Sequence, residues 1–301
     1  MAFTVLAMHR RYEILQGTPI TIEDHGGEGQ PIVAIHGLGG SAGNWSLVGP
    51  RLAEVGRMLA LDLPGHGRSG PAPSHDLEAH TRTVVDAIEL HGFRRVILVA
   101  NSMGGLVAKL VVATRPDLVG ALVLLAPATP LPTIVVPSNP AVAARLAVQS
   151  LPGIGPLATA AIRARFTPRG QVEETLRIVM HDPTRLPADA FERAVELVRL
   201  RRTMPWASRA FAESVASVRR TLIRRSTYYG ILDAVSVPTT MIFGSEDQVV
   251  SPVALRWLAG RQKTWRSIEL AETGHTPMYE RPDIVVREVA RAVEAFAARP
   301  G

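Results

Sequence analysis

The stretch Val99-Ala-Asn-Ser-Met-Gly-Gly105 decides the fold prediction, because it sets a serine between an apolar run and a helical pattern. The run Arg95–Ala100 predicts a buried strand, and Met103–Thr114 has apolar residues at spacings of three and four. A sharp turn from strand to helix strains the serine backbone and exposes its hydroxyl above the sheet. Small residues stand two places before and two places after the serine, where the backbone is crowded. The stretch predicts a nucleophile at Ser102, with a simple helix cap as the alternative.

Five further apolar runs lie on either side of this stretch, and they predict the rest of a sheet: Ile32–Ile35, Arg57–Leu61, Ala121–Leu125, Thr239–Phe243 and Ser267–Leu270. Continuous rather than alternating runs suit strands buried on both faces, as in a parallel sheet. Tyr12–Leu15 and Thr18–Glu23 predict an opening hairpin. Helices are expected over Asn44–Val55, Leu77–His91 and Ile284–Ala298. Strand–helix alternation of this kind predicts an α/β fold with a doubly wound, mostly parallel sheet.

The alternation stops in the middle of the chain, where helical patterns follow one another without a convincing strand. These patterns lie near residues 141–151, 156–165, 172–180, 188–202 and 208–218. We therefore predict a core of residues 1–128 and 236–301, with an all-helical cap over residues 129–235. Apolar residues at the start of the cap are expected to pack it onto the core, with contact to an anionic lipid surface as the alternative: Leu146, Val148, Leu151, Ile154 and Leu157.

The basic charge of the chain is concentrated in this central segment. The net charge is +6, yet residues 131–230 hold 15 Arg and Lys against 7 Asp and Glu, and the rest holds 18 against 20. We interpret the excess as arginine-rich, solvated helix faces, with contact to an anionic substrate or membrane surface as the alternative. Few aromatic residues interleave with the arginines and no nucleic-acid motif is recognisable, so we expect no nucleic-acid partner.

The absence of cysteine narrows the chemistry. It excludes disulfides, thiolate metal sites and a cysteine nucleophile. The apolar stretch within Met1–Arg11 is too short for the core of a secretory signal. No apolar run reaches the about 18–20 residues that a membrane helix needs. We therefore expect a soluble, cytoplasmic protein.

A serine hydroxyl needs a base within hydrogen-bond reach, and His275 is the best placed of the nine histidines. It lies in Thr273-Gly-His-Thr-Pro277, directly after the last apolar run. Loops at the carboxyl ends of strands are where ligands meet an open α/β sheet. His36 and His66 lie in glycine-rich loops, where we expect the imidazole to brace a turn.

The acid of the site must hold the other imidazole nitrogen and stabilise its positive charge. Phe243-Gly-Ser-Glu-Asp-Gln248 follows the fifth apolar run and contains two carboxylates. Asp247 is favoured over Glu246, because its place after the Gly-Ser turn suits an inward-pointing loop residue. Either could otherwise be an ordinary turn acid. The chain order Ser102, Asp247, His275 is the order expected of α/β-hydrolases.

Over almost its whole length the chain resembles the capped α/β-hydrolase family. His36-Gly-Leu-Gly39 resembles that family's oxyanion loop, and Asp62-Leu-Pro-Gly-His-Gly-Arg-Ser69 resembles its turn after the next strand. The segments around Asp247 and His275 match the acid and base. Ala100 departs from the pattern, since the family usually has glycine there. The resemblance implies an α/β-hydrolase fold, with the helical insertion as its cap.

The resemblance also implies a mechanism. The backbone N–H groups of Leu38 and Met103 would form the oxyanion hole, and water would hydrolyse an acyl-enzyme formed on Ser102. No metal or cofactor is required. A serine at this place argues against the dehalogenases and epoxide hydrolases, which resemble the chain but use an aspartate nucleophile.

Carboxylic esters of small or medium apolar compounds are the expected substrates, because esters demand least of the leaving group. A C–C bond hydrolase of ring-cleavage products is the alternative, since Asn44-Trp45 and the serine turn are similar to that group. Trp45 is therefore a candidate substrate contact. Thr276 departs from that group, which usually has tryptophan after the histidine. A lipase and a non-catalytic ligand receptor on the same fold also stay open. Several cap arginines could bind a substrate carboxylate: Arg163, Arg165, Arg169 and Arg177.

Overall fold

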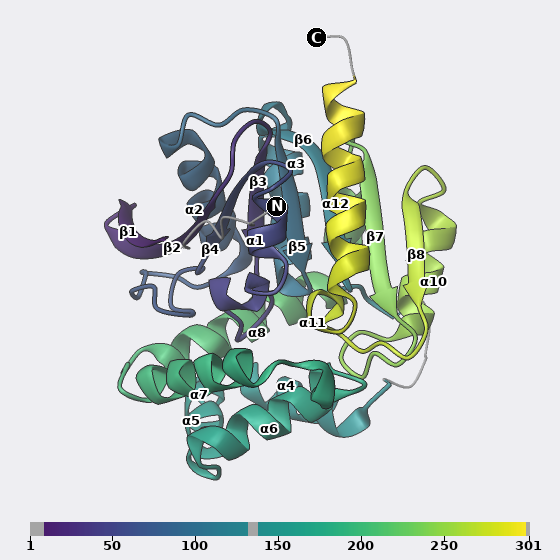
Figure 1. Ribbon diagram of the computed structural model, residues 1–301. Helices are drawn as coiled ribbons and strands as arrows, with labels where there is room; N and C mark the ends of the chain where they lie inside the picture. The colour runs from purple at the N-terminus through teal and green to yellow at the C-terminus, as the bar shows by residue number, and fades with distance from the viewer. Residues whose placement is uncertain (1–8, 132–137, 299–301) are drawn as a thin grey trace.

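The computed structural model describes residues 9–131 and 138–298, in which a sheet of eight strands has helices on both faces (Figure 1). The strand order is β1-β2-β4-β3-β5-β6-β7-β8. Only the pairs β1–β2 and β2–β4 are antiparallel among the described strands. The strands are β1 (His9–Leu15), β2 (Thr18–Gly26), β3 (Pro31–Ile35), β4 (Arg57–Leu61), β5 (Val96–Asn101), β6 (Val119–Leu125), β7 (Thr239–Gly244) and β8 (Arg266–Leu270). The prediction of a mostly parallel, doubly wound sheet is confirmed.

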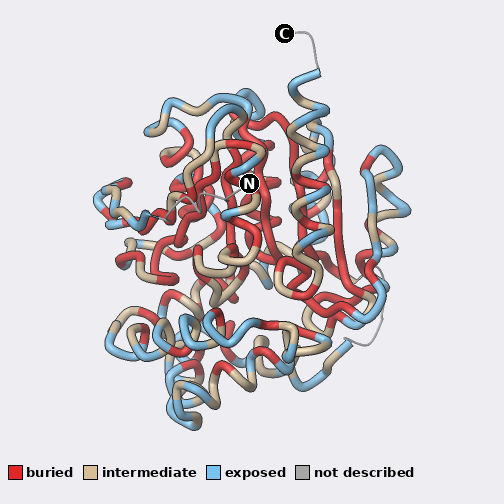
Figure 2. Tube along the Cα trace, viewed as in Figure 1, coloured by how far each residue is buried: buried red, intermediate tan, exposed pale blue. Residues whose placement is uncertain are grey.

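Two apolar cores lie on the two faces of the sheet. On one face pack α2 (Leu77–Leu90), α3 (Met103–Thr114), α9 (Arg225–Asp233) and α10 (Pro252–Arg261). On the other face lie the short α1 (Gly49–Leu52), α11 (Pro277–Glu280) and α12 (Pro282–Ala297). Every residue of β5 and β6 is buried, as expected for strands covered on both sides. Figure 2 shows this red, buried sheet inside partly exposed helices.

One helix prediction needs correction, and the core helices α9 and α10 were not predicted. The helix expected over Asn44–Val55 is a 3-10 turn, η1 (Ala42–Trp45), followed by the separate α1. Pro50 lies in the first turn of α1, where its missing N–H does no harm, whereas inside a longer helix it would break the hydrogen-bond ladder. Helix α10 was not predicted, because its segment Pro252–Arg261 is apolar at almost consecutive positions and shows no clear helical period.

The cap predicted between β6 and β7 consists of helices that lie across the carboxyl ends of the strands (Figure 1). They are α4 (Pro140–Gln149), α5 (Gly155–Ala164), α6 (Pro168–Val179), α7 (Ala188–Arg202) and α8 (Ala207–Ile223). A separate apolar cluster joins α6 to α7. The sequence limits of the cap, residues 129–235, remain a prediction. Among the described residues no helix is both long and apolar enough to cross a membrane.

The apolar residues around the α4–α5 turn do not pack the cap onto the core, so that expectation is wrong. Val148, Leu151, Ile154 and Leu157 are 45%, 41%, 55% and 73% exposed, and Leu146 is only partly buried. The reason is that α5 turns Gly155 and Thr159 inward, with Gly155 against α8. A side chain at Gly155 would come within 3.2 Å of Ala212 Cβ, so the larger residues face outward.

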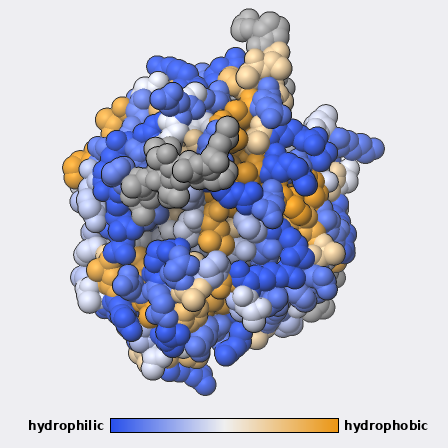
Figure 3. All heavy atoms as spheres, viewed as in Figure 1, coloured by the Kyte–Doolittle hydropathy of each residue, from blue (hydrophilic) through white to orange (hydrophobic). Residues whose placement is uncertain are grey.

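Most of the surface in Figure 3 is hydrophilic with separate hydrophobic patches, the usual mixture on a protein surface. A run of four exposed apolar residues is a more unusual feature. We call these four residues the apolar turn.

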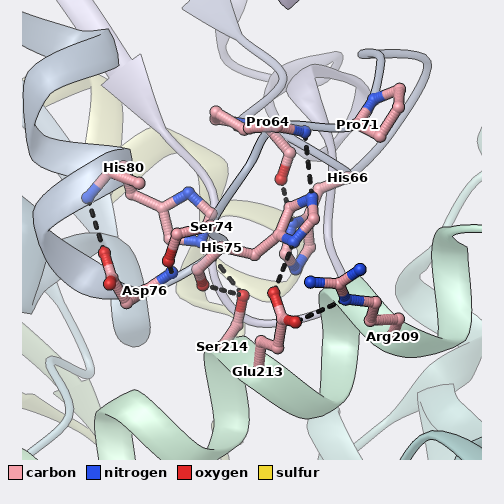
Figure 4. A network of polar contacts seen from close by, with 12 residues as sticks. Pro64, His66, Pro71, Ser74, His75, Asp76, His80, Arg209, Glu213 and Ser214 are labelled. Carbon is pink, nitrogen blue, oxygen red and sulfur yellow. Dashed lines mark hydrogen bonds and ion pairs between the residues drawn. The ribbon is translucent and has the colours of Figure 1, made fainter.

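Helix α8 ties the cap to the core through a partly buried polar network (Figure 4). Glu213 accepts a 2.8 Å hydrogen bond from His75 Nδ1 and a 2.6 Å bond from Arg209. Ser214 Oγ donates to the His75 carbonyl at 2.8 Å and lies 3.0 Å from His80 Nε2. Because Ser214 already donates to the carbonyl, His80 must be the donor in the second bond. Residues about 140 positions apart are therefore fixed against each other at this end of the cap.

Candidate active site

The candidate nucleophile lies in a strained turn between β5 and α3. Ser102 has φ 54° and ψ −117°, a conformation that L-residues rarely adopt. Its own N–H donates to the Leu125 carbonyl at 3.0 Å, and its carbonyl accepts from Ala128 N–H at 3.0 Å. Gly104 is required by crowding, because a Cβ there would lie 2.5 Å from the Ile35 carbonyl oxygen. The predicted strand–turn–helix is therefore present, and it is held on both sides.

The predicted acid and base are paired. His275 Nδ1 lies 2.7 Å from Asp247 Oδ2, and both residues are buried. The other oxygen of Asp247 accepts the backbone N–H groups of Val249 and Val250 at 2.7 and 2.9 Å. Since an ionised carboxylate only accepts, His275 carries its proton on Nδ1, which leaves Nε2 as the proton acceptor. This is the tautomer that a general base needs.

The parallel register brings the three predicted residues to one edge of the sheet. Ser102 follows β5, Asp247 follows β7 and His275 follows β8, all at carboxyl ends. Asn101 adds a direct link, which the sequence did not reveal. Its Nδ2 donates to the Leu125 carbonyl at 3.0 Å and to the His275 carbonyl at 3.1 Å.

The loop that carries His275 is also fixed to the cap. The His275 N–H donates to the Val179 carbonyl, at the end of α6, at 2.8 Å. The buried Glu280 accepts from Gly274 N–H at 2.8 Å and from His181 N–H at 2.9 Å. One carboxylate thus joins the base loop to the cap. Glu280 is a second positioning residue that the sequence did not indicate, because its partner on the cap is 99 positions away.

The expected oxyanion donors lie beside the serine. A Cβ on Gly37 would be 3.0 Å from Ser102 Cβ, so the His36–Gly39 loop passes directly against the strained turn. Among the described residues, no acceptor is found for the N–H of Leu38. Met103 is the first residue of α3, where the helix supplies no acceptor for its N–H. Both groups are therefore available to a substrate oxygen.

Buried histidines brace these loops, as predicted for His36. Its Nδ1 lies 2.7 Å from the Gly37 carbonyl and its Nε2 accepts the Leu63 N–H at 3.0 Å, so the ring is neutral with the proton on Nδ1. Burial lowers the pKa of His36 to about 4. His66, 5.5 Å from the His36 ring, lies 3.1 Å from the Pro64 carbonyl through Nδ1, and burial holds its pKa well below the usual value. In the described part of the chain no group of three His, Asp or Glu residues is arranged to hold a metal ion.

Asp62 holds the turn after β4 together from the inside. Its two carboxylate oxygens accept backbone N–H groups from Ala42 at 2.6 Å and from Arg68 at 2.7 Å. Burial raises the pKa of Asp62 to about 6, although the two hydrogen bonds oppose that rise. Asp62 therefore positions two loops and is not a partner of the candidate base.

A fully buried lysine lies below the serine on α3. Lys109 Nζ is 3.5 Å from the Tyr228 hydroxyl and 4.9 Å from the centre of its ring. The Tyr228 hydroxyl lies 3.4 Å from Thr129 Oγ1, just after β6. Burial lowers the pKa of Lys109 to about 7. The lysine joins α3 to α9, and no sequence signal indicated this.

Trp45 does not lie on an accessible surface of the site. It is completely buried and packs in the core cluster on the α12 face of the sheet, with Val48 and Leu125 among its members. Its neighbour Asn44 donates to the Tyr279 hydroxyl at 2.8 Å, a bond that joins η1 to α11. Trp45 is therefore a core residue in this structure. The predicted contact between Trp45 and the substrate is not part of our proposal.

Comparison with known proteins agrees with this fold. Residues 32–288 match the model of the Alpha/beta hydrolase family, and the chain belongs to that family. The crystal structure of a bacterial membrane phospholipase A superposes with a TM-score of 0.77 at 23% identity, covering 98% of this chain and 88% of that one. At this identity the likeness supports the fold.

Three curated relatives have different activities. A 2-hydroxy-6-oxo-6-(2'-aminophenyl)hexa-2,4-dienoic acid hydrolase of Metapseudomonas resinovorans is 29% identical over 91% of this chain and 86% of its own length. The pimeloyl-[acyl-carrier protein] methyl ester esterase of Klebsiella pneumoniae is 28% identical over 85% and 91%. The acetyltransferase component of a Pseudomonas putida acetoin cleaving system is 41% identical, but over only 34% of this chain and 28% of its own. The shared property of the first two is hydrolysis.

Proposed function

We propose that this chain is a serine hydrolase that cleaves a carboxylic ester through an acyl-enzyme on Ser102. The observation that carries the proposal is the combination of the strained backbone at Ser102 with the 2.7 Å pair of His275 and Asp247 at the same sheet edge. A structural serine has no need of a conformation that costs roughly 1–3 kcal/mol.

In the proposed mechanism, Nε2 of His275 takes the proton of the Ser102 hydroxyl as the oxygen attacks the ester carbonyl. Asp247 stabilises the imidazolium that forms. The N–H groups of Leu38 and Met103 hold the developing oxyanion, and loss of one such donor typically costs about 10²–10³ in turnover. His275 then protonates the leaving alcohol, and water repeats the sequence on the acyl-enzyme.

The ester class is supported by a relative. The methyl ester esterase from Klebsiella is similar over 85% of this chain, and its printed activity is ester hydrolysis. The dienoic acid hydrolase is similar over 91%, so C–C bond hydrolysis is the competing activity. Thr276, in place of the tryptophan usual in that group, favours the ester.

Esters of longer chains, as in a lipase, are a second candidate that the apolar turn favours. Exposed apolar residues on the cap, in the segment with the basic excess, suit contact with a lipid aggregate. If this is correct, the double variant Ile154→Ser and Leu157→Ser loses activity on an emulsified long-chain ester and keeps activity on a short, dissolved one. Equal rates for the variant and the wild type on both substrates would exclude it.

The first experiment measures hydrolysis of p-nitrophenyl esters from acetate to palmitate, together with labelling by a fluorophosphonate. The wild type should cleave and be labelled, and Ser102→Ala should do neither. Ser267→Ala, which changes an exposed serine on β8, is the matched control and should behave as the wild type. Labelling at Ser102 without ester cleavage would favour the C–C hydrolase. If the wild type is neither labelled nor able to cleave any ester, the proposed enzyme activity is contradicted and a non-catalytic ligand receptor is favoured.

A further inference from the structure

Arg201, at the end of cap helix α7, is a buried cation that lacks a carboxylate partner. The residue is 9% exposed. Its Nη1 donates to the Gly39 carbonyl at 3.0 Å. Its Nε is buried without any hydrogen-bond partner, whereas Nη2 is not fully enclosed. Within residues 9–131 and 138–298, no carboxylate oxygen forms an ion pair with this guanidinium.

A buried charge with this little compensation is unusual, because charged groups taken out of water are normally paired. Asp62 acts on Arg201 from a distance, but both of its oxygens already accept backbone N–H groups. The neighbouring cation Arg163 adds repulsion. The surroundings of Arg201 are therefore short of negative charge.

The other cap arginines suggested by the sequence either have partners elsewhere or are exposed. Arg163 donates to the Arg201 carbonyl at 2.8 Å and to Ser208. Arg169 pairs with Glu192, and Arg177 pairs with Glu174. Arg165 is exposed. Arg201 differs from all of them, because it is enclosed and still has donors to offer.

The position of Arg201 is next to the reacting groups of the proposed hydrolase. Gly39, whose carbonyl it holds, follows Leu38 in the oxyanion loop, and Phe211 of α8 covers the same glycine. The guanidinium is bonded to the Gly39 carbonyl, and Leu38 is the residue before Gly39. Because consecutive Cα atoms are about 3.8 Å apart, the guanidinium lies within roughly 10 Å of the Leu38 N–H. A substrate held by that N–H could therefore reach Arg201 with a second polar group.

We propose that Arg201 binds a carboxylate of the substrate, so that the preferred esters carry a free acid group a few carbons from the scissile carbonyl. Guanidinium presents planar donors that match a carboxylate. The inference rests on the proposed function and names the substrate class of the same site.

The test compares monoethyl esters of dicarboxylic acids, from succinate to suberate, with the corresponding diethyl esters. For the best chain length, kcat/KM of the wild type should favour the monoester at least about tenfold, since that ratio is about 1.4 kcal/mol of differential binding. Arg201→Met should lose this preference, so that its ratio of monoester to diester kcat/KM falls toward one. Arg199→Met, which changes an exposed arginine on the same helix, is the matched control and should keep the preference.

Two outcomes overturn the proposal: no preference of the wild type for the monoester, or an equal loss on both esters in Arg201→Met with an unchanged ratio. The second would mean that Arg201 only positions the oxyanion loop. Should Arg201→Met fail to fold, Arg201→Gln keeps an N–H donor for Gly39 and removes the charge.

A binding measurement separates this proposal from the proposed function. Calorimetric titration of the wild type and of Ser102→Ala with the free dicarboxylates should show binding that Arg201→Gln weakens about tenfold or more. This holds even if no ester is cleaved. Absence of binding to both proteins, alongside normal ester cleavage, would reject the carboxylate subsite and leave the hydrolase intact.

Discussion

The side-chain amide of Asn101 donates a 3.1 Å hydrogen bond to the backbone carbonyl of His275, 174 positions along the chain. The residue next to the candidate nucleophile thereby positions the loop of the candidate base. A base must lie within a narrow range of distance and direction to take a proton. This bond joins two of the three candidate catalytic segments without itself touching the reacting atoms.

Asn101→Ala should lower kcat more than it raises KM, because the His275 loop loses its link to the serine turn. Its free energy of unfolding should fall by about 1–3 kcal/mol, since the Leu125 and His275 carbonyls lose a buried donor. Ester kinetics and urea unfolding measure both effects. Gln30→Ala removes a comparable amide-to-carbonyl bond at the surface and should change neither strongly. Unchanged kcat in Asn101→Ala would exclude the positioning role.

Gly104→Ala should destabilise the protein by about 3 kcal/mol and reduce activity, because the new methyl group would press on the Ile35 and His36 carbonyls. Gly230→Ala is the matched control. This glycine lies in helix α9 with nothing within 4 Å of the added carbon, so alanine should stabilise the protein by about 0.5–1 kcal/mol. Thermal unfolding of both variants checks the pair, and a stable, active Gly104→Ala would contradict the crowding described here.

Stability should decrease as the pH falls below about 6.5. Burial lowers the pKa of His36 to about 4 and that of His80 to about 3, and holds the pKa of His66 well below its usual value. The unfolded chain, with histidine pKa values near 6.5, therefore binds protons that the folded chain does not. Asp62 opposes the trend, because its raised pKa of about 6 lets the folded state take up one proton first.

His25 and His91 also have lowered pKa values, so five histidines outweigh one aspartate. The net loss should be about 1.4 kcal/mol per pH unit for each excess proton that the unfolded state binds. The urea midpoint measured from pH 7 to pH 4.5 follows this loss. His80→Leu should flatten the profile, whereas His181→Leu, at an exposed position, should not. A midpoint independent of pH over this range would show that these rings are not held neutral.

Lys109→Met should stabilise the protein at pH 7. Burial lowers the pKa of Lys109 to about 7, against about 10.4 for an unfolded lysine, so the unfolded state binds the proton more tightly. Between pH 7 and 9 the wild type should gain up to about 1.4 kcal/mol per pH unit, and the methionine variant should lack this gain. Lys263→Met, at an exposed lysine, should leave the wild-type profile unchanged. A rising profile in Lys109→Met would assign the effect to another group.

The fold was predictable because its signals are local. Continuous apolar runs marked the strands of the parallel sheet, and the small residues around Ser102 marked the turn. The same holds for Asp247 and His275, each of which follows a strand in a short, distinctive segment. The predicted pairing of His275 with Asp247 matches the 2.7 Å distance that the structure gives.

The parts that sequence did not reveal depend on contacts between distant segments. Asn101, Glu280 and Arg201 take their importance from partners 174, 99 and 162 positions away, and each alone is an ordinary polar residue. The apolar turn was misjudged for a related reason. Helical periodicity gives the apolar side of a segment, but only the fold decides that α5 turns Gly155 and Thr159 inward and leaves Leu157 in water.

The complete burial of Lys109 has a practical consequence. The chain contains only two lysines, and the other, Lys263, is exposed in the loop before β8. That loop lies at the amino end of a parallel strand, opposite the carboxyl ends that carry Ser102 and His275. Amine-reactive dyes or surfaces should therefore find a single side-chain attachment point. Coupling through it would immobilise the molecules in one orientation, with the cap free to meet its ligands.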